Sequence, residues 1–164
     1  MLKPVRTRAR ASLAGGRFAI VASRYNARYV DGMLRAARAE LKRAGLAEVR
    51  VVRVPGAFEV PVVAGALARQ HPGWDAVICL GVILQGQTSH AQHIGEAVTA
   101  GLTQIAVSTG VPMIHEVLVF TNEEQARVRC LGKEFNRGAE AAQTALKMAA
   151  VMRELAVADD GIPF

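Results

Sequence analysis

A nearly continuous apolar run from Asp75 to Leu84 constrains the fold more than any other segment of the chain. Every residue after Asp75 in this run is hydrophobic or glycine. Such a run is typical of a strand in a parallel sheet, which is buried on both faces. Cys79 lies inside the run, where a cysteine behaves as a small hydrophobic side chain. The run therefore predicts a sheet that helices cover on both sides.

Shorter strands and amphipathic helices alternate along the rest of the chain. Between residues 30 and 44, apolar side chains recur every three or four residues, which predicts a helix that ends at the glycine Gly45. The predicted strands are 18–22, 49–54, 75–84 and 113–120, and the predicted helices are 30–44, 61–69, 94–110, 123–129 and 136–155. Because parallel strands need crossover connections, we predict an α/β fold: a three-layer αβα sandwich with a parallel, flavodoxin-like four-stranded sheet.

The chain has 164 residues, enough for one domain with its own core. Its formal net charge is +6, and four basic residues lie within the first ten, which indicates a basic arm rather than a nucleic-acid-binding face. We predict a basic N-terminal arm over residues 1–16, one domain over 17–156 and a C-terminal tail over 157–164. Two cysteines and no apolar stretch of about 20 residues favour a cytoplasmic protein with no membrane partner.

Ligands of open parallel sheets bind beyond the carboxyl ends of the strands. This rule selects four segments: 23–28, 55–61, 85–93 and the residues from 121 onward. In the third segment, backbone N–H groups from Gly86 to His90 and the positive end of the next helix favour an anion such as phosphate. An ordinary alternative stays open, in which Thr88 or Ser89 only caps the helix. The sequence lacks the glycine patterns of P-loop and dinucleotide-binding proteins.

Several side chains in these segments are candidates for catalysis or binding, and each has a structural alternative. His90 could transfer protons near neutral pH, or pair with His93 around a metal, although no third ligand lies nearby. Glu59 could accept hydrogen bonds from substrate hydroxyls or only complement a helix N-terminus. Tyr25 could be an aromatic platform or cover the sheet edge, and Arg129 could bind an anion or be a solvated helix residue.

Four motifs occur together in the order and spacing of the lumazine synthase family, which the chain resembles from about Arg17 to Leu155. They are Ser-Arg-Tyr-Asn at 23–26, Gly-Ala-Phe-Glu-Val-Pro at 56–61, Gly-Val-Ile-Leu-Gln-Gly-Gln-Thr-Ser-His at 81–90, and Glu-Gln-Ala at 124–126 with Arg129 and Asn-Arg-Gly at 136–138. The most specific elements are Gly-Ala-Phe-Glu-Val-Pro and Gly-x-Thr-x-His, because each is rare and they lie at the expected separation.

The resemblance implies a transferase of riboflavin biosynthesis. It would condense 5-amino-6-(D-ribitylamino)uracil with 3,4-dihydroxy-2-butanone 4-phosphate to form 6,7-dimethyl-8-ribityllumazine, without a cofactor or a metal. His90 would be the catalytic residue that transfers protons. The residues that would bind the substrates are Tyr25, Asn26, Ala57, Phe58, Glu59, Val82, Ile83, Leu84, Gln87, Thr88, His115, Arg129 and Arg137. Among them, Tyr25 would stack on the pyrimidine, and Gln87 and Thr88 with Arg129 would hold the phosphate.

The chain departs from the family pattern around the expected site. The family has Arg or Lys at Gln85, Phe or Tyr at Ala91, Asp at Gln92, Tyr at His93, Phe-Gly at His115-Glu116 and Lys at Arg137. We expect His115 still to stack on the pyrimidine and Arg137 to keep the positive charge. The change at Gln92 removes a carboxylate that would orient His90, so we expect an active enzyme with altered activity.

Members of the family assemble as pentamers with active sites between neighbouring subunits, and some pack twelve pentamers into a hollow icosahedral shell. The resemblance implies that Arg129 and His115 act across a subunit boundary from the other site residues. Riboflavin synthase is a further expected partner. Two alternatives stay open: a noncatalytic relative that binds a flavin or ribityl ligand or only forms shells, and a generic flavodoxin-like phosphate-binding module.

Overall fold

The computed structural model describes residues 15–46 and 48–159, so most of the predicted N-terminal arm and the last five residues lie outside it. The elements follow in the order β1 (Phe18–Ser23), α1 (Ala27–Arg43), β2 (Arg50–Val54), the 3-10 turn η1 (Ala57–Glu59), α2 (Val60–Ala68), β3 (Ala76–Leu84), α3 (His90–Thr109), β4 (Met113–Phe120), α4 (Glu123–Leu131) and α5 (Arg137–Asp159). Each predicted strand and helix is present.

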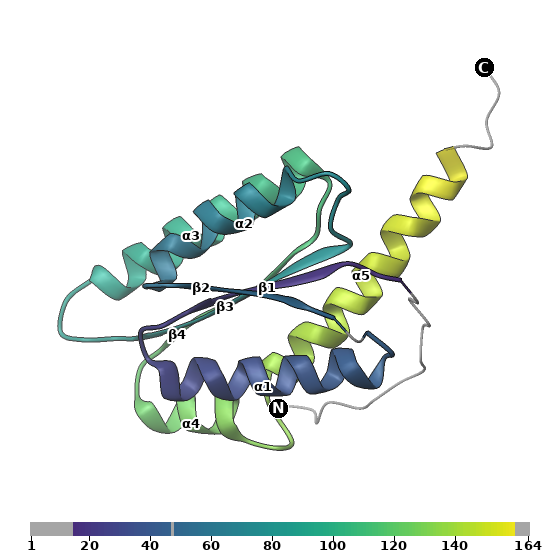
Figure 1. Ribbon diagram of the computed structural model, residues 1–164. Helices are drawn as coiled ribbons and strands as arrows, with labels where there is room; N and C mark the ends of the chain where they lie inside the picture. The colour runs from purple at the N-terminus through teal and green to yellow at the C-terminus, as the bar shows by residue number, and fades with distance from the viewer. Residues whose placement is uncertain (1–14, 47, 160–164) are drawn as a thin grey trace.

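The four strands form one parallel sheet in the order β2-β1-β3-β4. Helices α2 and α3 cover one face, and α1, α4 and α5 cover the other (Figure 1). The predicted three-layer α/β fold is therefore confirmed. The chain leaves β1 toward β2 on one side and returns to β3 on the other, so the strand order reverses between β1 and β3. In open sheets of this kind, ligands bind beyond the carboxyl ends of the strands at such a reversal.

The core has two halves, one on each face of the sheet. Strand β3 is buried along nearly its whole length, as its apolar sequence predicted. Cys79 and Cys130 are both free and buried. Burial raises the pKa of the Cys79 thiol to about 12, so this thiol stays protonated and serves as an apolar core group.

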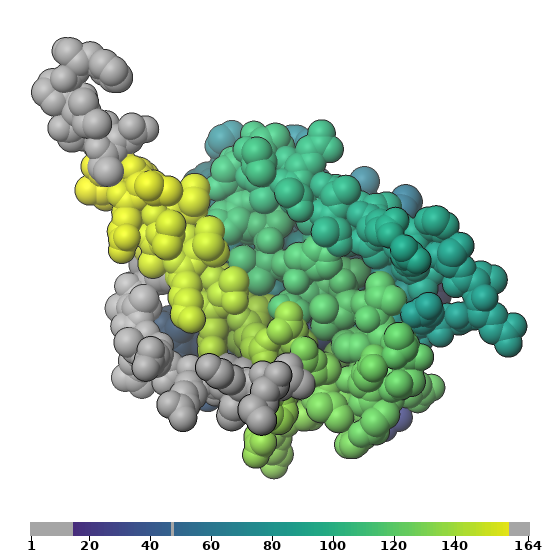
Figure 2. Space-filling model, turned by 180° about the vertical axis from the view of Figure 1, so that it is seen from behind, coloured from purple at the N-terminus to yellow at the C-terminus, as the bar shows by residue number. Residues whose placement is uncertain are grey.

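Helix α1 ends as its sequence predicted. Gly45 has φ 89, a left-handed conformation, and the N–H of Leu46 donates to the carbonyl of Leu41. Helix α5 is longer than predicted: it continues to Asp159 and so includes residues 157–159 of the predicted tail. Its C-terminal part projects past the sheet and forms the yellow surface in Figure 2.

Close backbone contacts fix α4 and α5 against α1. A Cβ atom on Gly138, in the first turn of α5, would lie 2.0 Å from the carbonyl oxygen of Met33 in α1. A Cβ atom on Gly32 would lie 2.6 Å from the carbonyl oxygen of Cys130 in α4. Only glycine permits these approaches, and they place Arg129 and Arg137 on the α1 face of the sheet. No helix in the described part of the chain is long and apolar enough to span a membrane.

Candidate active site

The loops at the carboxyl ends of β1, β2 and β3 are tied together by hydrogen bonds. The backbone N–H groups of Arg24 and Tyr25 donate to the carbonyl of Pro55, which follows β2. Asn26 has φ 55, and its Nδ2 donates to the carbonyl oxygen of Val82 in β3 over 2.8 Å. Asparagine tolerates this left-handed conformation better than most residues. The sequence predicted Asn26 as a substrate ligand, and the structure shows that its side chain joins the β1 loop to β3.

These loops and the start of α3 surround a cleft of about 570 Å³, called the His90 cleft below. Its lining residues are Tyr25, Gly56, Ala57, Phe58, Glu59, His90, His93, Ile94 and Ala97. Tyr25 and Phe58 are 71% and 60% exposed, although aromatic residues are usually more buried. Five residues that the sequence predicted to act at the site therefore line one cleft: Tyr25, Ala57, Phe58, Glu59 and His90. Asn26 is not among the lining residues.

Glu59 ends the 3-10 turn η1 and precedes α2. The N–H of Gly56 donates to Oε2 of Glu59 over 2.8 Å, which holds the carboxylate in place at the rim of the cleft. A Cβ atom on Gly56 would lie 2.9 Å from this oxygen and 3.0 Å from the ring of Tyr25. A side chain at position 56 would therefore have to displace the carboxylate of Glu59 and the ring of Tyr25. Gly56 belongs to the rare Gly-Ala-Phe-Glu motif, but its own role was not predicted from the sequence.

Helix α3 begins at His90, directly after an exposed loop that contains Gln87 and Thr88. Ser89 occupies the N-cap position, but its side chain makes no capping hydrogen bond. The Oγ1 atom of Thr88 receives only a long contact of 3.5 Å from the N–H of His90. Neither Thr88 nor Ser89 therefore caps the helix with a short hydrogen bond, although the sequence left such a capping role open. The N–H groups at this helix end can donate to an anion instead.

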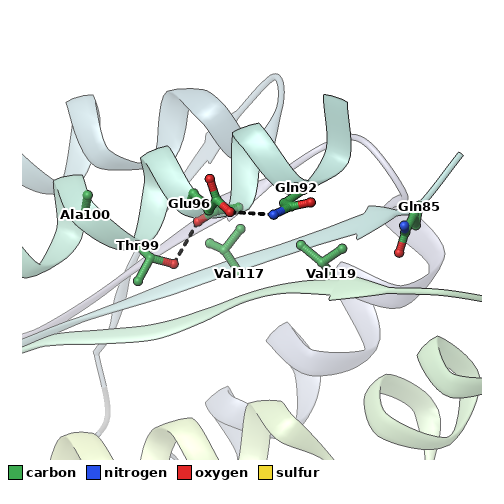
Figure 3. Close-up of a pocket in the computed structure, with 8 residues that line it drawn as sticks. Gln85, Gln92, Glu96, Thr99, Ala100, Val117 and Val119 are labelled. Atoms are coloured by element: carbon green, nitrogen blue, oxygen red, sulfur yellow. Dashed lines mark hydrogen bonds between the residues drawn. The ribbon is translucent and has the colours of Figure 1, made fainter. Parts of the chain in front are cut away.

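The first turns of α3 present side chains to two different cavities, one on each of two helix faces. His90, His93, Ile94 and Ala97 line the His90 cleft at the spacing of one helix face. Gln92, Gly95, Glu96, Thr99 and Ala100 line a second groove of about 590 Å³ between α3 and β4, together with Gln85, Val117 and Val119 (Figure 3). Gln92 donates to Glu96 there over 2.7 Å. Because Gln92 and His90 lie on different faces, the expectation that a residue at position 92 orients His90 has no support within one chain.

His115 lies on β4 beside the second groove and is held by two hydrogen bonds. The N–H of Val117 donates to Nδ1 of His115 over 3.2 Å, so Nδ1 is unprotonated. Nε2 therefore carries the proton and donates to Oγ1 of Thr99, which lies 2.8 Å away and itself donates to the carbonyl of Gly95. Burial lowers the pKa of His115. The side chain is thus a neutral, fixed imidazole along the edge strand of the sheet.

Glu116, the next residue of β4, points to the opposite face of the sheet and meets charges from α4 and α5. Its Oε2 accepts from Nε of Arg137 over 2.9 Å, and Arg137 Nη1 donates to Glu140. Burial raises the pKa of Glu116 to about 7, against the opposing effect of Arg137. Arg129 Nη1 is buried, with no hydrogen-bond partner among residues 15–46 and 48–159. We call these four residues the arginine cluster: Arg129, Arg137, Glu116 and Glu140.

Not all of the predicted site residues line the His90 cleft, which contains the candidate proton donor and the aromatic rings. Val82, Ile83 and Leu84 lie at the end of β3, and Gln87 and Thr88 lie in the loop that follows it. His115 lies beside the second groove, and Arg129 and Arg137 lie in the arginine cluster on the other face. Sequence reasoning missed Glu116 as a partner of Arg137. Within the described residues, no group of three His, Cys, Asp or Glu side chains is arranged to hold a metal ion.

Comparisons with known proteins agree on one family. The family model described as 6,7-dimethyl-8-ribityllumazine synthase matches residues 15–153. A protein of that name from Kineococcus radiotolerans is 46% identical over 150 residues, which cover 90% of this chain and 92% of the relative. Proteins of the same name from Saccharopolyspora erythraea and Mycobacterium avium are 41% and 42% identical. Their alignments cover 90% and 87% of this chain and 89% and 88% of the relatives.

Proposed function

The chain belongs to the 6,7-dimethyl-8-ribityllumazine synthase family, and on that premise we propose that it condenses 5-amino-6-(D-ribitylamino)uracil with 3,4-dihydroxy-2-butanone 4-phosphate. The products are 6,7-dimethyl-8-ribityllumazine, inorganic phosphate and water. The observation that carries the proposal is the composition of the His90 cleft. Two exposed aromatic rings, a held carboxylate and a histidine meet there at the carboxyl ends of the strands, where ligands of such sheets bind.

The side chains of the His90 cleft match the chemistry of the two substrates. The ring of Tyr25 offers a flat apolar surface for the pyrimidine, and the carboxylate of Glu59 accepts hydrogen bonds from ribityl hydroxyls. The N–H groups at the start of α3, with Gln87 and Thr88, receive the phosphate. Holding the two reactants side by side supplies much of the rate enhancement, because the first bond forms between two separate molecules.

His90 transfers the protons that the condensation requires. The amine nitrogen of one substrate attacks the ketone carbon of the other, and its proton must be removed while the oxygen is protonated and leaves as water. Phosphate then leaves as a carbon-bound proton is removed. The ribityl-bearing nitrogen attacks the remaining carbonyl carbon, whose oxygen leaves as a second water when the ring closes. A histidine can take up and return protons at several of these steps near neutral pH. Its exposed place in the first turn of α3 puts it beside the loop that receives the phosphate.

We further propose that the active site is completed by a second copy of the chain in a homopentamer. Arg129 and His115, which we expect to act at the site, do not line the His90 cleft of their own chain. Strand β4 lies at the edge of the sheet, and Val119 on it is 40% exposed. Helix α5 exposes Val151, Leu155 and Val157, and apolar side chains gathered on a surface favour association.

The larger assembly and the setting are proposals as well. A shell of twelve pentamers is supported by the segment between Arg129 and Asn136, which has no insertion relative to the shell-forming pattern. Family membership supports a cytoplasmic location and riboflavin synthase as a partner, because that enzyme consumes the lumazine product.

Mixing the purified protein with both substrates tests the proposed activity. The lumazine product is followed by its absorbance and fluorescence, and each substrate is omitted in turn as a control. We expect a protein-dependent rate that saturates in both substrates and exceeds the uncatalysed reaction. A rate equal to the uncatalysed background, from folded protein that is oligomeric by light scattering, would overturn the proposal.

A further inference from the structure

The arginine cluster contains a nearly buried ion pair on the α1 face of the sheet. The side chain of Glu116 is only 8% exposed, and its Oε2 lies 2.9 Å from Nε of Arg137. Arg137 is also paired with Glu140 in the first turns of α5. Two carboxylates therefore engage the guanidinium that the resemblance assigned to the substrates.

Arg129 is in a different state from Arg137. Its charge acts on Glu116 from α4, but it makes no ion pair among the described residues, and its buried Nη1 lacks a hydrogen-bond partner there. A buried N–H group without a partner costs free energy, and a movement of the Arg129 side chain toward an acceptor can recover it. Within the cluster, Arg129 is thus the cation that has no carboxylate partner among the described residues.

We infer that Glu116 is a positioning residue. By pairing with Arg137, it leaves Arg129 to bind the phosphate of the butanone substrate. Because Glu116 neutralises the charge of Arg137, it lowers the affinity of the site for that phosphate. The inference rests on the proposed function, since the anion concerned is the phosphate of that substrate. Glu116 contacts no substrate in this account. It acts through the charge that it neutralises, because oppositely charged neighbours reduce the attraction of a guanidinium for a further anion.

The protonation of Glu116 adds a second observable. Burial raises its pKa to about 7, while the charges that face it are Arg129 from α4 and Arg137 and Glu140 from α5. Cys130 on α4 is a further titratable neighbour, and burial raises the pKa of its thiol to about 12, so it is uncharged near pH 7. The neighbouring residue on β3 is Leu80, which is apolar. The carboxylate is consequently charged at pH 8 and largely neutral at pH 6.

Binding of inorganic phosphate to the assembled protein, measured by calorimetry in low salt, tests the inference. At pH 8 we expect Glu116→Gln to bind phosphate roughly threefold to tenfold more tightly than wild type, because one opposing charge is lost. The ratio between the two proteins should shrink toward one at pH 6. Phosphate itself titrates in this range, but it does so equally for both proteins, so the ratio isolates Glu116.

Two further variants separate this inference from a direct role of Arg137. Arg137→Gln should bind phosphate within about twofold of wild type, because Glu116 becomes neutral when its partner is removed. The gain in Glu116→Gln should disappear when Arg137→Gln is added, as a double-mutant cycle would show. Glu140→Gln is the matched control, since it removes the other carboxylate of Arg137, which is more exposed; its effect should be smaller than that of Glu116→Gln.

Each result decides the matter. Phosphate binding that is unchanged or weaker in Glu116→Gln would overturn the inference, and so would a tenfold loss of phosphate binding in Arg137→Gln. Should Glu116→Gln fail to fold, the Arg137→Gln result alone still decides. Absence of lumazine formation would defeat the proposed function without changing these titrations, so the two failures are distinguishable.

Discussion

The His90 cleft and the arginine cluster are built in opposite ways. In the His90 cleft, Tyr25, Phe58 and His90 are exposed, and the backbone holds them through loop hydrogen bonds between three strands. In the arginine cluster, Glu116 is buried and the charges are held mainly by one another. The comparison teaches that one region is open and ready for a ligand, whereas the other has its charge largely compensated before any ligand arrives.

The open region should show the largest catalytic effect. We expect His90→Ala to lower kcat by about 100-fold or more, because it removes the proton-transfer group, with little change in stability since the side chain is exposed. His93→Ala, which alters the same cleft one turn later, should cost far less. Steady-state rates of lumazine formation check both variants. Equal rates for His90→Ala and wild type would contradict the role given to His90.

The charged region should show its effect on one substrate only. Arg129→Gln is expected to raise KM for the butanone phosphate by about tenfold and to leave KM for the pyrimidine nearly unchanged, since charge-assisted bonds to phosphate are lost. Initial rates with each substrate varied in turn measure the two constants. A similar rise in both constants would indicate a general loss of structure instead.

A pair of glycines tests how the backbone shapes the His90 cleft. We expect Gly56→Ala to raise KM for the pyrimidine severalfold, because its Cβ would push against Glu59 and the ring of Tyr25. Gly73→Ala, away from the cleft, is the matched control: a Cβ there meets nothing within 4 Å, and its φ is not in the left-handed range. Kinetic constants for both variants, with circular dichroism to check folding, decide the point. Equal losses in the two variants would contradict this account.

The smallest effect concerns stability and pH. In the folded chain the pKa of Glu116 is raised from 4.5 to about 7, so between these values the folded state binds a proton that the unfolded state does not. This group therefore favours folding at low pH, and that contribution is lost as pH rises toward and through 7. We expect the Tm of wild type to fall by a few degrees relative to Glu116→Gln between pH 5 and pH 7.5. Parallel Tm curves would contradict the raised pKa.

Much of the fold was predictable because its strands and helices carry strong local patterns. The apolar run from Asp75 to Leu84 predicted the buried strand β3, and Gly45 predicted the end of α1. The boundary of α5 was missed, because residues 156–158 are compatible with a helix and the stop signals Gly161 and Pro163 come only later in the sequence. Candidate ligands at strand ends, such as Tyr25 and Glu59, were found since the carboxyl ends of parallel strands share one edge.

The relations between side chains were harder to predict. Positions 90 and 92 lie on different faces of α3, which helical spacing could have indicated once the helix was known to begin at His90. The pairing of Glu116 with Arg137 joins residues 21 positions apart on a strand and a helix. No local pattern specifies such a pair, because it depends on how closely α5 packs against the sheet and α1.

Mixing two impaired variants tests most directly whether two copies of the chain build one active site. His90→Ala and Arg129→Gln are denatured together, refolded into mixed oligomers and assayed for lumazine formation with the butanone phosphate well below its KM, where both variants alone are slow. If His90 and Arg129 come from neighbouring subunits of a ring, about a quarter of the sites regain both groups, and activity well above that of either variant returns. Activity no greater than the average of the two variants, from fully mixed oligomers, would contradict the shared site.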